Sequence, residues 1–333
     1  MYPLTFKPIY IEKIWAGNKL KKLKSDINEK SVGISWEFSG HKNADSIIRN
    51  GKYSGMSFSE LLKKQGEKLI GTKINKNQIL RTAILDAAES LSIQVHPNDE
   101  YARIHENDNG KNEAWYIMDA DEGAYITAGT KTQDVNVLKK AVLDGNLEDY
   151  VVKVPVKKGD IAVMKTGLLH ALGKGILAVE IGENGDTTYR FYDYNRGRKL
   201  DIKKSFDVIK PEQQCFKPKY ISISYDGYRK SYCYLGSEYA LELIDVESLY
   251  KNESNIERYY IYTCVDGQCH IKYSDCSEEI NMGESVFIPA TAGKYTFEGK
   301  CRLMRSYIPN IEKVKKEILM NITMQYNCIQ NFL

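Results

Sequence analysis

The sequence predicts a mainly β protein built of two barrels, with a few helices at the periphery. Many short segments rich in Val, Ile, Tyr and Thr are separated by Gly, Asp and Asn, which is typical of a sandwich or barrel. The chain contains 24 tyrosines, and its 333 residues exceed what a single core usually holds. A pattern that begins at Gly159 is also repeated at Gly283.

The strands are expected in two groups, one on each side of residue 212. Their segments read EAWYIMD, GAYITAG, VVKVPVKKGDIAVM and GILAVEI in the first group, and YALELIDV, ERYYIYTCVDGQCHIKYS, GESVFIPA and GKYTFEGKCRLMRSYI in the second. Helical periodicity is confined to residues 57–71, with Ser57 or Ser59 as the cap, and to residues 134–150 and 308–320. We expect these helices to pack on the outside or to bridge the two halves.

The internal repeat aligns GDIAVMKTGLLHALGKG, from Gly159, with GESVFIPATAGKYTFEG, from Gly283. Each copy has a glycine, an acid, an apolar run, a turn and a second strand, and His170 falls opposite Lys294. A duplicated β unit that binds a ligand in only one copy would show this pattern. A chance alignment of two Gly-acid turns is the alternative.

Composition limits the class of protein. The net charge is +3, which does not indicate a nucleic-acid-binding protein, and no run of about 18 apolar residues indicates a membrane span. The start, MYPLTFKPIY, lacks the pattern of a signal peptide. All seven cysteines follow residue 214 without a paired zinc spacing, so we expect free thiols, a cytoplasmic location and a domain boundary between residues 212 and 213.

The segment LSIQVHPNDEYA, residues 91–102, alternates between two kinds of side chain. Leu91, Ile93 and Val95 predict an apolar face that packs on the surroundings of the barrel. The opposite face carries Ser92, Gln94 and His96, and we expect it to face a cavity.

A metal site requires several ligands that converge from separate strands. The chain has only five histidines; His96 lies beside Gln94, and His170 lies between apolar neighbours that imply burial. Glu113 shares one strand face with Trp115 and Ile117. Gln94, His96, Glu113 and His170 could therefore meet inside a barrel, although a lone strand histidine is more often a hydrogen-bonded structural residue.

Several segments, in order, resemble one family. VKKGDIAVMKTGLLHALG has the form of the second metal-binding motif of cupin barrels. EKIWAGNKLKKL, GISWEFSGH, SLSIQVHPNDEYA, GKNEAWYIMDA, LLHALGKGILAVEI and DTTYRFYDYNR are similar to successive segments of type I mannose-6-phosphate isomerases of the short bacterial kind. The strong matches cover about residues 10–200, and the last third follows the family only in general pattern.

The resemblance implies two cupin-like (jelly-roll) barrels. Residues 1–212 would be the metal-binding catalytic domain with helical insertions, and residues 213–333 a second, degenerate cupin-like domain. It further implies one Zn²⁺ per chain and three sets of site residues. These are Gln94, His96, Glu113 and His170 as metal ligands, Arg190, Lys111, Glu180 and Asp186 as catalytic residues, and Ser92, Lys111 and Arg190 as substrate-binding residues.

The implied reaction is the reversible conversion of mannose 6-phosphate to fructose 6-phosphate by metal-assisted proton transfer through an enediol. The partner would be a small sugar phosphate, and the chain would act as a monomer or homodimer. The base stays open between a carboxylate such as Glu180, a water at the metal and an imidazole. The alternatives are a non-catalytic sugar-phosphate-binding paralogue and a cupin metalloenzyme that acts on another sugar.

Structural interpretations compete with these roles. Arg190 and Asp186 could form a structural ion pair, Lys111 could be a solvated turn residue, and the NRGRK stretch has the composition of a solvated linker. The sequence also departs from the family pattern at Ile34, in the turn Lys165–Leu168 and at residues 182–185. We expect these departures to lie around the pocket without removing a metal ligand.

Overall fold

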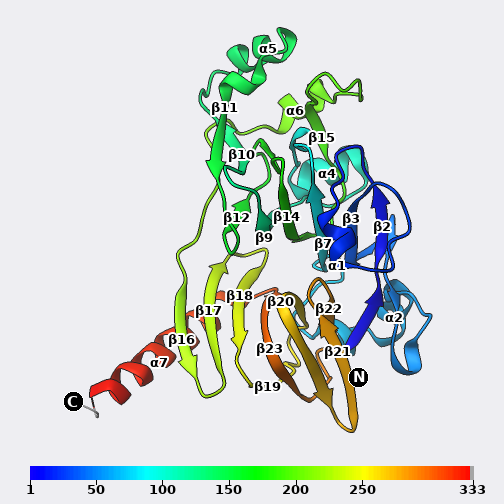
Figure 1. The fold of residues 1–333 in the computed structure, drawn as a ribbon, viewed down its shortest axis with the longest axis vertical. Helices are drawn as coiled ribbons and strands as arrows, with labels where there is room; N and C mark the ends of the chain where they lie inside the picture. The colour runs from blue at the N-terminus through cyan, green and yellow to red at the C-terminus, as the bar shows by residue number, and fades with distance from the viewer. Residues whose placement is uncertain (331–333) are drawn as a thin grey trace. The chain divides into compact units, whose positions relative to one another are not determined.

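The computed structural model describes residues 1–330, with side chains to residue 323, and it confirms a mainly β architecture (Figure 1). The chain forms two compact units. We call residues 8–46 and 81–218 the histidine unit, and residues 1–7, 47–80 and those from Lys219 onward the tyrosine unit.

The units differ from the expected division of the chain at residues 212 and 213. The boundary on the carboxyl side lies at Pro218, but residues 1–7 and 47–80 belong to the same unit as the last third of the chain. Hydrogen bonding is the reason: β1 (Leu4–Lys7) pairs with β22 (Ser285–Ile288) and with β6 (Ile47–Ile48). A division drawn along the sequence cannot anticipate such long-range pairing.

The histidine unit contains two larger antiparallel sheets and a short hairpin. The five-stranded sheet has the order β11 (Val151–Pro155), β10 (Tyr125–Thr130), β13 (His170–Ala171), β8 (Ile93–Val95) and β15 (Tyr189–Tyr192). The six-stranded sheet has the order β12 (Ile161–Met164), β9 (Glu113–Ala120), β14 (Ile176–Glu183), β7 (Leu80–Ala87), β3 (Val32–Phe38) and β2 (Ile9–Glu12). The hairpin pairs β4 (Gly40–His41) with β5 (Ala44–Asp45).

The main core of this unit lies between its two larger sheets. Trp115 and Ala178 of the six-stranded sheet pack in one cluster with Ile126 and Ala128 of the five-stranded sheet. A second cluster, which includes Ile93, covers the other face of the five-stranded sheet with residues from α5 (Val135–Leu143) and the 3-10 helix η2 (Leu147–Tyr150), and α6 (Ile202–Val208) packs against it. The remaining helices are α1 (Lys19–Leu23) and α4 (Asp99–Glu106).

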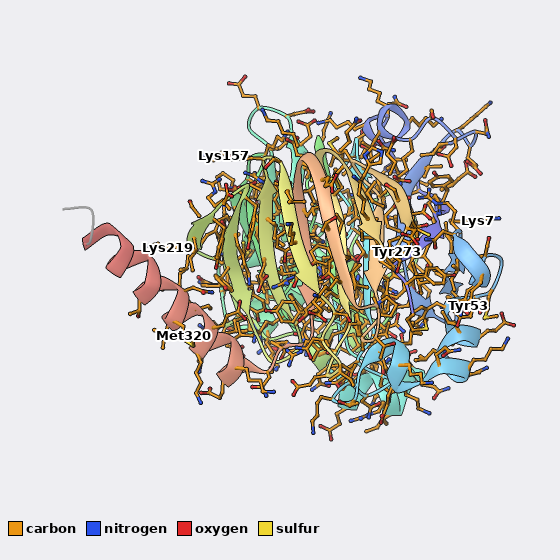
Figure 2. All side chains as sticks on the ribbon, turned by 90° about the horizontal axis from the view of Figure 1, so that it is seen from below. Lys7, Tyr53, Lys157, Lys219, Tyr273 and Met320 are labelled. Atoms are coloured by element: carbon orange, nitrogen blue, oxygen red, sulfur yellow. The ribbon has the colours of Figure 1, made fainter. Side chains whose placement is uncertain are left out.

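The tyrosine unit contains one ten-stranded sheet. Its further strands are β16 (Ile221–Tyr225), β17 (Tyr228–Leu235), β18 (Ala240–Val246), β19 (Leu249–Glu253), β20 (Tyr260–Tyr273), β21 (Cys276–Asn281) and β23 (Lys294–Tyr307). The long strands β20 and β23 pair with each other, and their inner side chains, among them Tyr262, Tyr295 and Phe297, form one buried cluster. Figure 2 labels Tyr273 at the end of β20.

Both helical segments predicted for the tyrosine unit are present. Residues 57–71 form α2 (Phe58–Gln65) and α3 (Glu67–Ile70), and the segment predicted at 308–320 begins α7 (Ile311–Gln330), which carries Met320 (Figure 2) and extends ten residues further. The short 3-10 helix η1 (Gly51–Tyr53) was not predicted. Ser57 rather than Ser59 caps α2: its hydroxyl accepts from Glu60 N while the Glu60 carboxylate accepts from Ser57 N. None of the helices in the described residues is long and apolar enough to cross a membrane.

The cysteines of the described side chains are free, as expected. They are Cys215, Cys233, Cys264, Cys269, Cys276 and Cys301. Cys328 lies outside the described side chains.

Candidate metal centre

The strand register brings the predicted ligands onto facing sheet surfaces. In the five-stranded sheet, Gln94 lies directly opposite His170 on one side and Arg190 on the other. Residues directly opposite one another in a sheet project to the same face, so these three share a surface. In the six-stranded sheet, Glu113 begins β9, and Trp115 pairs with Glu180 of β14.

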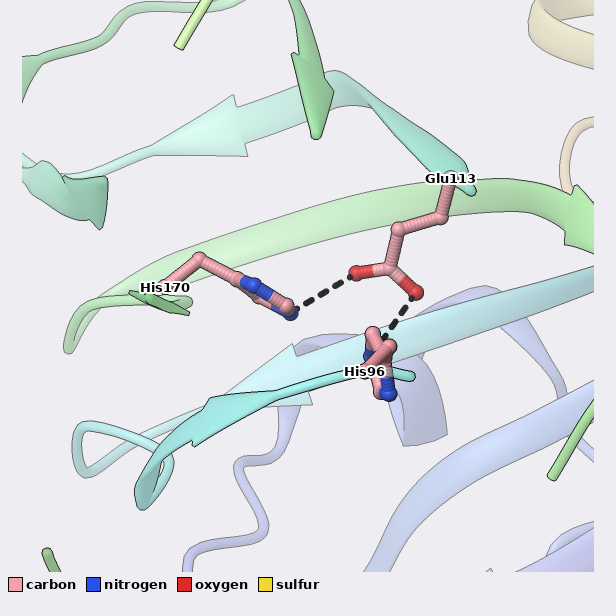
Figure 3. Close-up of side chains that lie close together, drawn as sticks. All are labelled: His96, Glu113 and His170. Carbon is pink, nitrogen blue, oxygen red and sulfur yellow. Dashed lines mark ion pairs between the residues drawn. The ribbon is translucent and has the colours of Figure 1, made fainter. Parts of the chain in front are cut away.

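Three buried side chains converge at this place. Figure 3 shows the imidazoles of His96 and His170 directed at the two oxygens of the Glu113 carboxylate. His96 Nε2 lies 3.5 Å from Glu113 Oε2, and His170 Nε2 lies 3.3 Å from Glu113 Oε1. Two ligands of one tetrahedral zinc, with bonds near 2.0–2.1 Å, are about 3.3 Å apart. The three ligand atoms all lie within 4.8 Å of one another, so the group could hold a metal ion.

Backbone carbonyls orient both imidazoles. His96 Nδ1 is 2.9 Å from Thr187 O, and His170 Nδ1 is 2.8 Å from Leu168 O. A carbonyl only accepts, so each Nδ1 carries the proton and each Nε2 presents its lone pair. Neither Nε2 has a well-directed hydrogen-bond partner among the residues that the structure describes. A buried nitrogen whose lone pair has no partner is costly, and a bound metal ion would accept both lone pairs.

The electrostatics favour the protonation states that metal ligands need. Burial, and then the nearby charge of Lys111, lower the pKa of His96, which keeps the imidazole neutral. Burial alone would raise the pKa of Glu113, but Lys111 and His96 hold it well below its ordinary value. A neutral imidazole and an ionised carboxylate are the forms that bind a divalent cation.

Comparison with known proteins supports one family. Residues 4–139 match the model of the phosphomannose isomerase type I catalytic domain, and residues 231–308 match that of the mannose-6-phosphate isomerase cupin domain. Mannose-6-phosphate isomerase from Streptococcus mutans is 32% identical over 92% of this chain and 98% of its own length. Mannose-6-phosphate isomerase ManA from Bacillus subtilis is 42% identical over 62% of this chain and 68% of its own length.

The chain belongs to the type I mannose-6-phosphate isomerase family.

Solved structures show the same fold. The mannose 6-phosphate isomerase from Bacillus subtilis superposes with a TM-score of 0.86 at 29% identity, covering 92% of this chain and 99% of that one. A mutant of phosphomannose isomerase from Salmonella typhimurium gives a TM-score of 0.73 at 16% identity, over 92% of this chain and 100% of that one, which is a likeness of fold alone. The predicted fold class, mainly β with cupin-like barrels, is therefore confirmed by the family match and the similar solved structures.

Most of the other site residues that the resemblance implies line a cavity of about 280 Å³. It is lined by Lys13, Trp15, Ile34, Trp36, Arg81, Leu85, Leu91, Ser92, Gln94, Lys111, Glu180, Asp186, Thr188, Arg190 and Arg198. Two residues of the polar face of segment 91–102, Ser92 and Gln94, line this cavity as predicted, whereas His96 is not among the lining residues. Leu91 also lines it, contrary to prediction, because β8 and its regular alternation begin only at Ile93.

Lys111 and Glu180 connect the cavity to the three-residue cluster. Lys111 Nζ lies 2.6 Å from Glu113 Oε2 and 2.7 Å from Glu180 Oε1, and Lys111 is buried, so it is not a solvated turn residue. Burial opposes the charge on Lys111, but Glu113 and Glu180 outweigh burial and raise its pKa. Glu180 Oε2 also accepts from Trp115 Nε1 at 3.2 Å.

Asp186 and Arg190 do not pair with each other, so the interpretation of these two residues as a structural ion pair is wrong. Asp186 Oδ1 lies 3.0 Å from Arg81 Nη1, and Asp186 Oδ2 accepts from Asn43 Nδ2 at 3.1 Å. Arg190 Nη1 donates to Lys199 O at 2.8 Å. Both side chains nevertheless line the cavity.

The positions at which the sequence departs from the family pattern do not all lie at one cavity. Ile34 lines the cavity, as expected, whereas Thr166 and Gly167 line a different cavity of about 260 Å³, contrary to expectation. The 165–168 turn still contacts both histidine strands, because Gly167 N donates to His96 O at 2.9 Å and Leu168 O accepts from His170. Gly182 lies opposite Glu113, where an added Cβ would approach Glu113 Cβ to 3.2 Å.

Sequence reasoning missed three cations of the cavity: Lys13, Arg81 and Arg198. Arg81 is a charged residue within the buried strand β7 and stacks on Trp36 at 4.0 Å, and its position in an apolar run was an available signal. Arg198 belongs to NRGRK, which is not a solvated linker, because Arg196 and Arg198 both pair with the buried Asp193. Burial is the largest cause that lowers the pKa of Lys13. The charges of Arg198 and Arg190 lower this pKa further, and the charge of Asp186 opposes them.

Proposed function

We propose that this protein is a metal-dependent mannose-6-phosphate isomerase that interconverts mannose 6-phosphate and fructose 6-phosphate. The observation that carries the proposal is the combination of a His96–Glu113–His170 cluster with an adjoining cationic cavity. Five cationic side chains and only two carboxylates line that cavity, which suits a dianionic phosphate ester. Its volume of about 280 Å³ fits a small ligand of hexose-phosphate size.

The proposed metal is one Zn²⁺ per chain, held by His96, Glu113, His170 and Gln94. Two imidazoles and a carboxylate form a donor set that suits zinc. Gln94 supports this assignment by its position directly opposite His170 in the sheet. When bound, the ion would polarise the substrate oxygens and ease removal of the proton from the neighbouring carbon.

The chain's own residues would bind the sugar phosphate and move the proton. Lys111 and Glu180 share a contact of 2.7 Å at the cavity wall, which suits a pair that takes a proton from one carbon and returns it to the next. Arg190 would stabilise negative charge that develops on oxygen, and Asp186 would hold a sugar hydroxyl. Ser92, together with Lys111 and Arg190, would contact the substrate.

The decisive experiment is turnover of mannose 6-phosphate in D2O, followed by proton NMR, before and after treatment with a chelator. An isomerase that acts through an enediol forms fructose 6-phosphate and exchanges the transferred hydrogen with solvent. We expect chelation to abolish turnover and Zn²⁺ to restore it. Absence of fructose 6-phosphate at every metal loading would sink the assignment.

Arg190→Ala separates the enzyme from a non-catalytic sugar-phosphate-binding paralogue, with the exposed Arg103→Ala as the matched control. The isomerase should lose kcat by about 100-fold, as when one oxyanion-stabilising donor is removed. A binding protein would show no turnover in either variant and only weaker affinity for mannose 6-phosphate. An enzyme for another sugar would leave mannose 6-phosphate unchanged while converting a different aldose phosphate.

The cytoplasmic location stays a prediction, and sedimentation velocity would distinguish the monomer from the homodimer.

A further inference from the structure

The loop between β14 and β15 supplies the carbonyl that orients His96. Thr187 lies in this loop, and its carbonyl oxygen is the acceptor 2.9 Å from His96 Nδ1. The position of the loop therefore determines which nitrogen of His96 carries the proton. The side chain that holds the loop is Asp108, which lies outside the cavity lining and outside every role assigned above.

The Asp108 carboxylate receives five hydrogen bonds. Its Oδ2 accepts from Asp186 N at 2.9 Å, from Thr187 N at 3.0 Å and from Thr187 Oγ1 at 2.7 Å. Its Oδ1 accepts from Asn109 N at 2.9 Å and lies 3.2 Å from His41 Nε2. Burial alone would raise the pKa of Asp108, but these hydrogen bonds, led by that of His41, hold it well below its ordinary value. Asp108 is therefore a fixed anion that binds two consecutive amides of the loop.

Close packing brings the loop against the segment that carries Asp108. A Cβ added at Gly185 would lie 2.4 Å from Asn109 O and 2.5 Å from Gly110 O, so no larger residue fits without movement of the backbone. The β4–β5 hairpin contributes from the other side, through His41 on Asp108 and Asn43 on Asp186. The loop is thus held at residues 185, 186 and 187 in succession.

We propose that Asp108 is a positioning residue of the metal centre, which acts through Thr187 to keep the proton on His96 Nδ1 and to present His96 Nε2 to the metal. This inference rests on the proposed function of the His96–Glu113–His170 cluster. Loss of Asp108 frees the Thr187 carbonyl, so the imidazole samples both tautomers and alternative ring orientations. Loss of groups that orient metal-ligating histidines typically weakens metal binding by about 10- to 100-fold.

The test compares Asp108→Ala and Asp108→Asn with Asp86→Ala. Asp86 is a matched control because it is another buried carboxylate of the histidine unit that accepts a backbone N–H, from Leu20 at 2.7 Å, away from His96. The first readout is the imidazole ¹⁵N spectrum of the metal-free protein, assigned by His96→Gln. The second readout is the zinc dissociation constant, measured by competition with a chromogenic chelator.

We expect Asp108→Ala to shift the His96 nitrogens away from the Nδ1-protonated pattern and to weaken zinc binding by about 10- to 100-fold. Asp108→Asn should lie between Asp108→Ala and the wild type, because an amide oxygen still accepts from part of the loop. Asp86→Ala should change neither readout. Wild-type His96 shifts and zinc affinity in Asp108→Ala would overturn the proposal, as would an equal loss of zinc affinity in Asp86→Ala.

If Asp108→Ala does not fold, Thr187→Val replaces it, since this variant keeps the carbonyl and removes only the Oγ1 hydrogen bond to Asp108. A smaller shift of the same sign at His96 supports the proposal, and an unchanged spectrum overturns it. The tautomer readout needs neither metal nor activity. A chain that binds no zinc would therefore refute the proposed metal centre while the role of Asp108 in orienting His96 is still decided.

Discussion

The two units build the same local β pattern and fill it with different chemistry. Gly159 in the histidine unit and Gly283 in the tyrosine unit both adopt positive φ, 91° and 87°, in the turn before a short buried strand. The next strand begins with His170 in one unit and with Lys294 in the other, at matching distances from the two glycines. The repeat in the sequence therefore corresponds to a repeat in local structure.

The interiors differ in how their buried polar groups are satisfied. His170 is buried and directed at Glu113, whereas Lys294 is exposed. In the tyrosine unit, Arg305 pairs with Glu242, which also accepts from Tyr307 at 2.8 Å, and the hydroxyls of Tyr262 and Tyr295 lie 2.9 Å apart. These polar groups pair mainly with one another, although Arg305 Nε has no hydrogen-bond partner among the described residues. In the histidine unit, two imidazole nitrogens face one carboxylate instead, and this group could hold a metal ion.

Removing a proposed metal ligand from the histidine unit should have the largest effect. We expect His170→Ala to abolish binding of the proposed zinc ion and to reduce kcat/KM for mannose 6-phosphate by about 1,000-fold or more, because a catalytic metal supplies several kcal/mol of stabilisation. Metal analysis of the purified variant and steady-state kinetics measure both effects. The matched control is His270→Ala, at a histidine that is half exposed in the tyrosine unit. Full zinc content in His170→Ala would contradict the proposal that the histidine unit holds the metal through His170.

Disrupting the polar centre of the tyrosine unit should cost stability and leave zinc binding intact. Glu242→Leu leaves Arg305 buried without its carboxylate, and we expect a loss of about 3–5 kcal/mol in the free energy of unfolding in urea. The double variant Glu242→Leu/Arg305→Met should recover much of that loss, because it removes both charges. Zinc loss in the folded single variant would show that this centre is not independent of the metal site.

Lys13 tests the cationic side of the cavity. Its Nζ has no ion-pair partner within 4 Å among the described residues, although the side chain lines the cavity. We expect Lys13→Met to raise KM for mannose 6-phosphate by about 10-fold with little change in kcat, since a charged hydrogen bond contributes about 1.5–3 kcal/mol. The exposed Lys22→Met serves as the control. An unchanged KM would remove Lys13 from the substrate site.

The smallest expected effect is a pH dependence in the tyrosine unit. Burial opposes ionisation of Asp245, but ion pairs with Arg302 and Arg229 lower its pKa. Its stabilising contribution is therefore present above about pH 4, the unfolded value, and is lost as pH falls through the lower folded value. Asp245→Asn should cost less than about 1 kcal/mol in urea unfolding at pH 7, and this cost should shrink as the pH falls below about 4. The exposed Asp226→Asn should show no such trend.

The parts of the site that follow strand periodicity could be predicted from the sequence. Alternation placed Gln94 on the cavity face, and the apolar neighbours of His170 predicted its burial. Contacts between distant segments could not be predicted in this way. The hydrogen bonds from Asp186 and Thr187 to Asp108 join residues on separate loops, and no spacing in the chain reports them.

The division into units shows the same limit. Phe58 packs on Phe287 with ring centroids 5.3 Å apart, which places an early helix with a late strand. The sequence predicted the helix and narrowed its cap to Ser57 or Ser59 because those features are local, and the structure shows Ser57. Which sheet the helix would cover depends on complementary surfaces that form only in the folded chain.

The turn at residues 165–168 links the two histidine strands through its backbone. Gly167 N donates to the backbone carbonyl of His96, and Leu168 O accepts from the ring of His170. The ring of His96 is oriented separately, by Thr187 O. A substitution in this short turn would therefore act on the backbone of one histidine and on the ring of the other, although the turn itself contributes no side chain to the cluster.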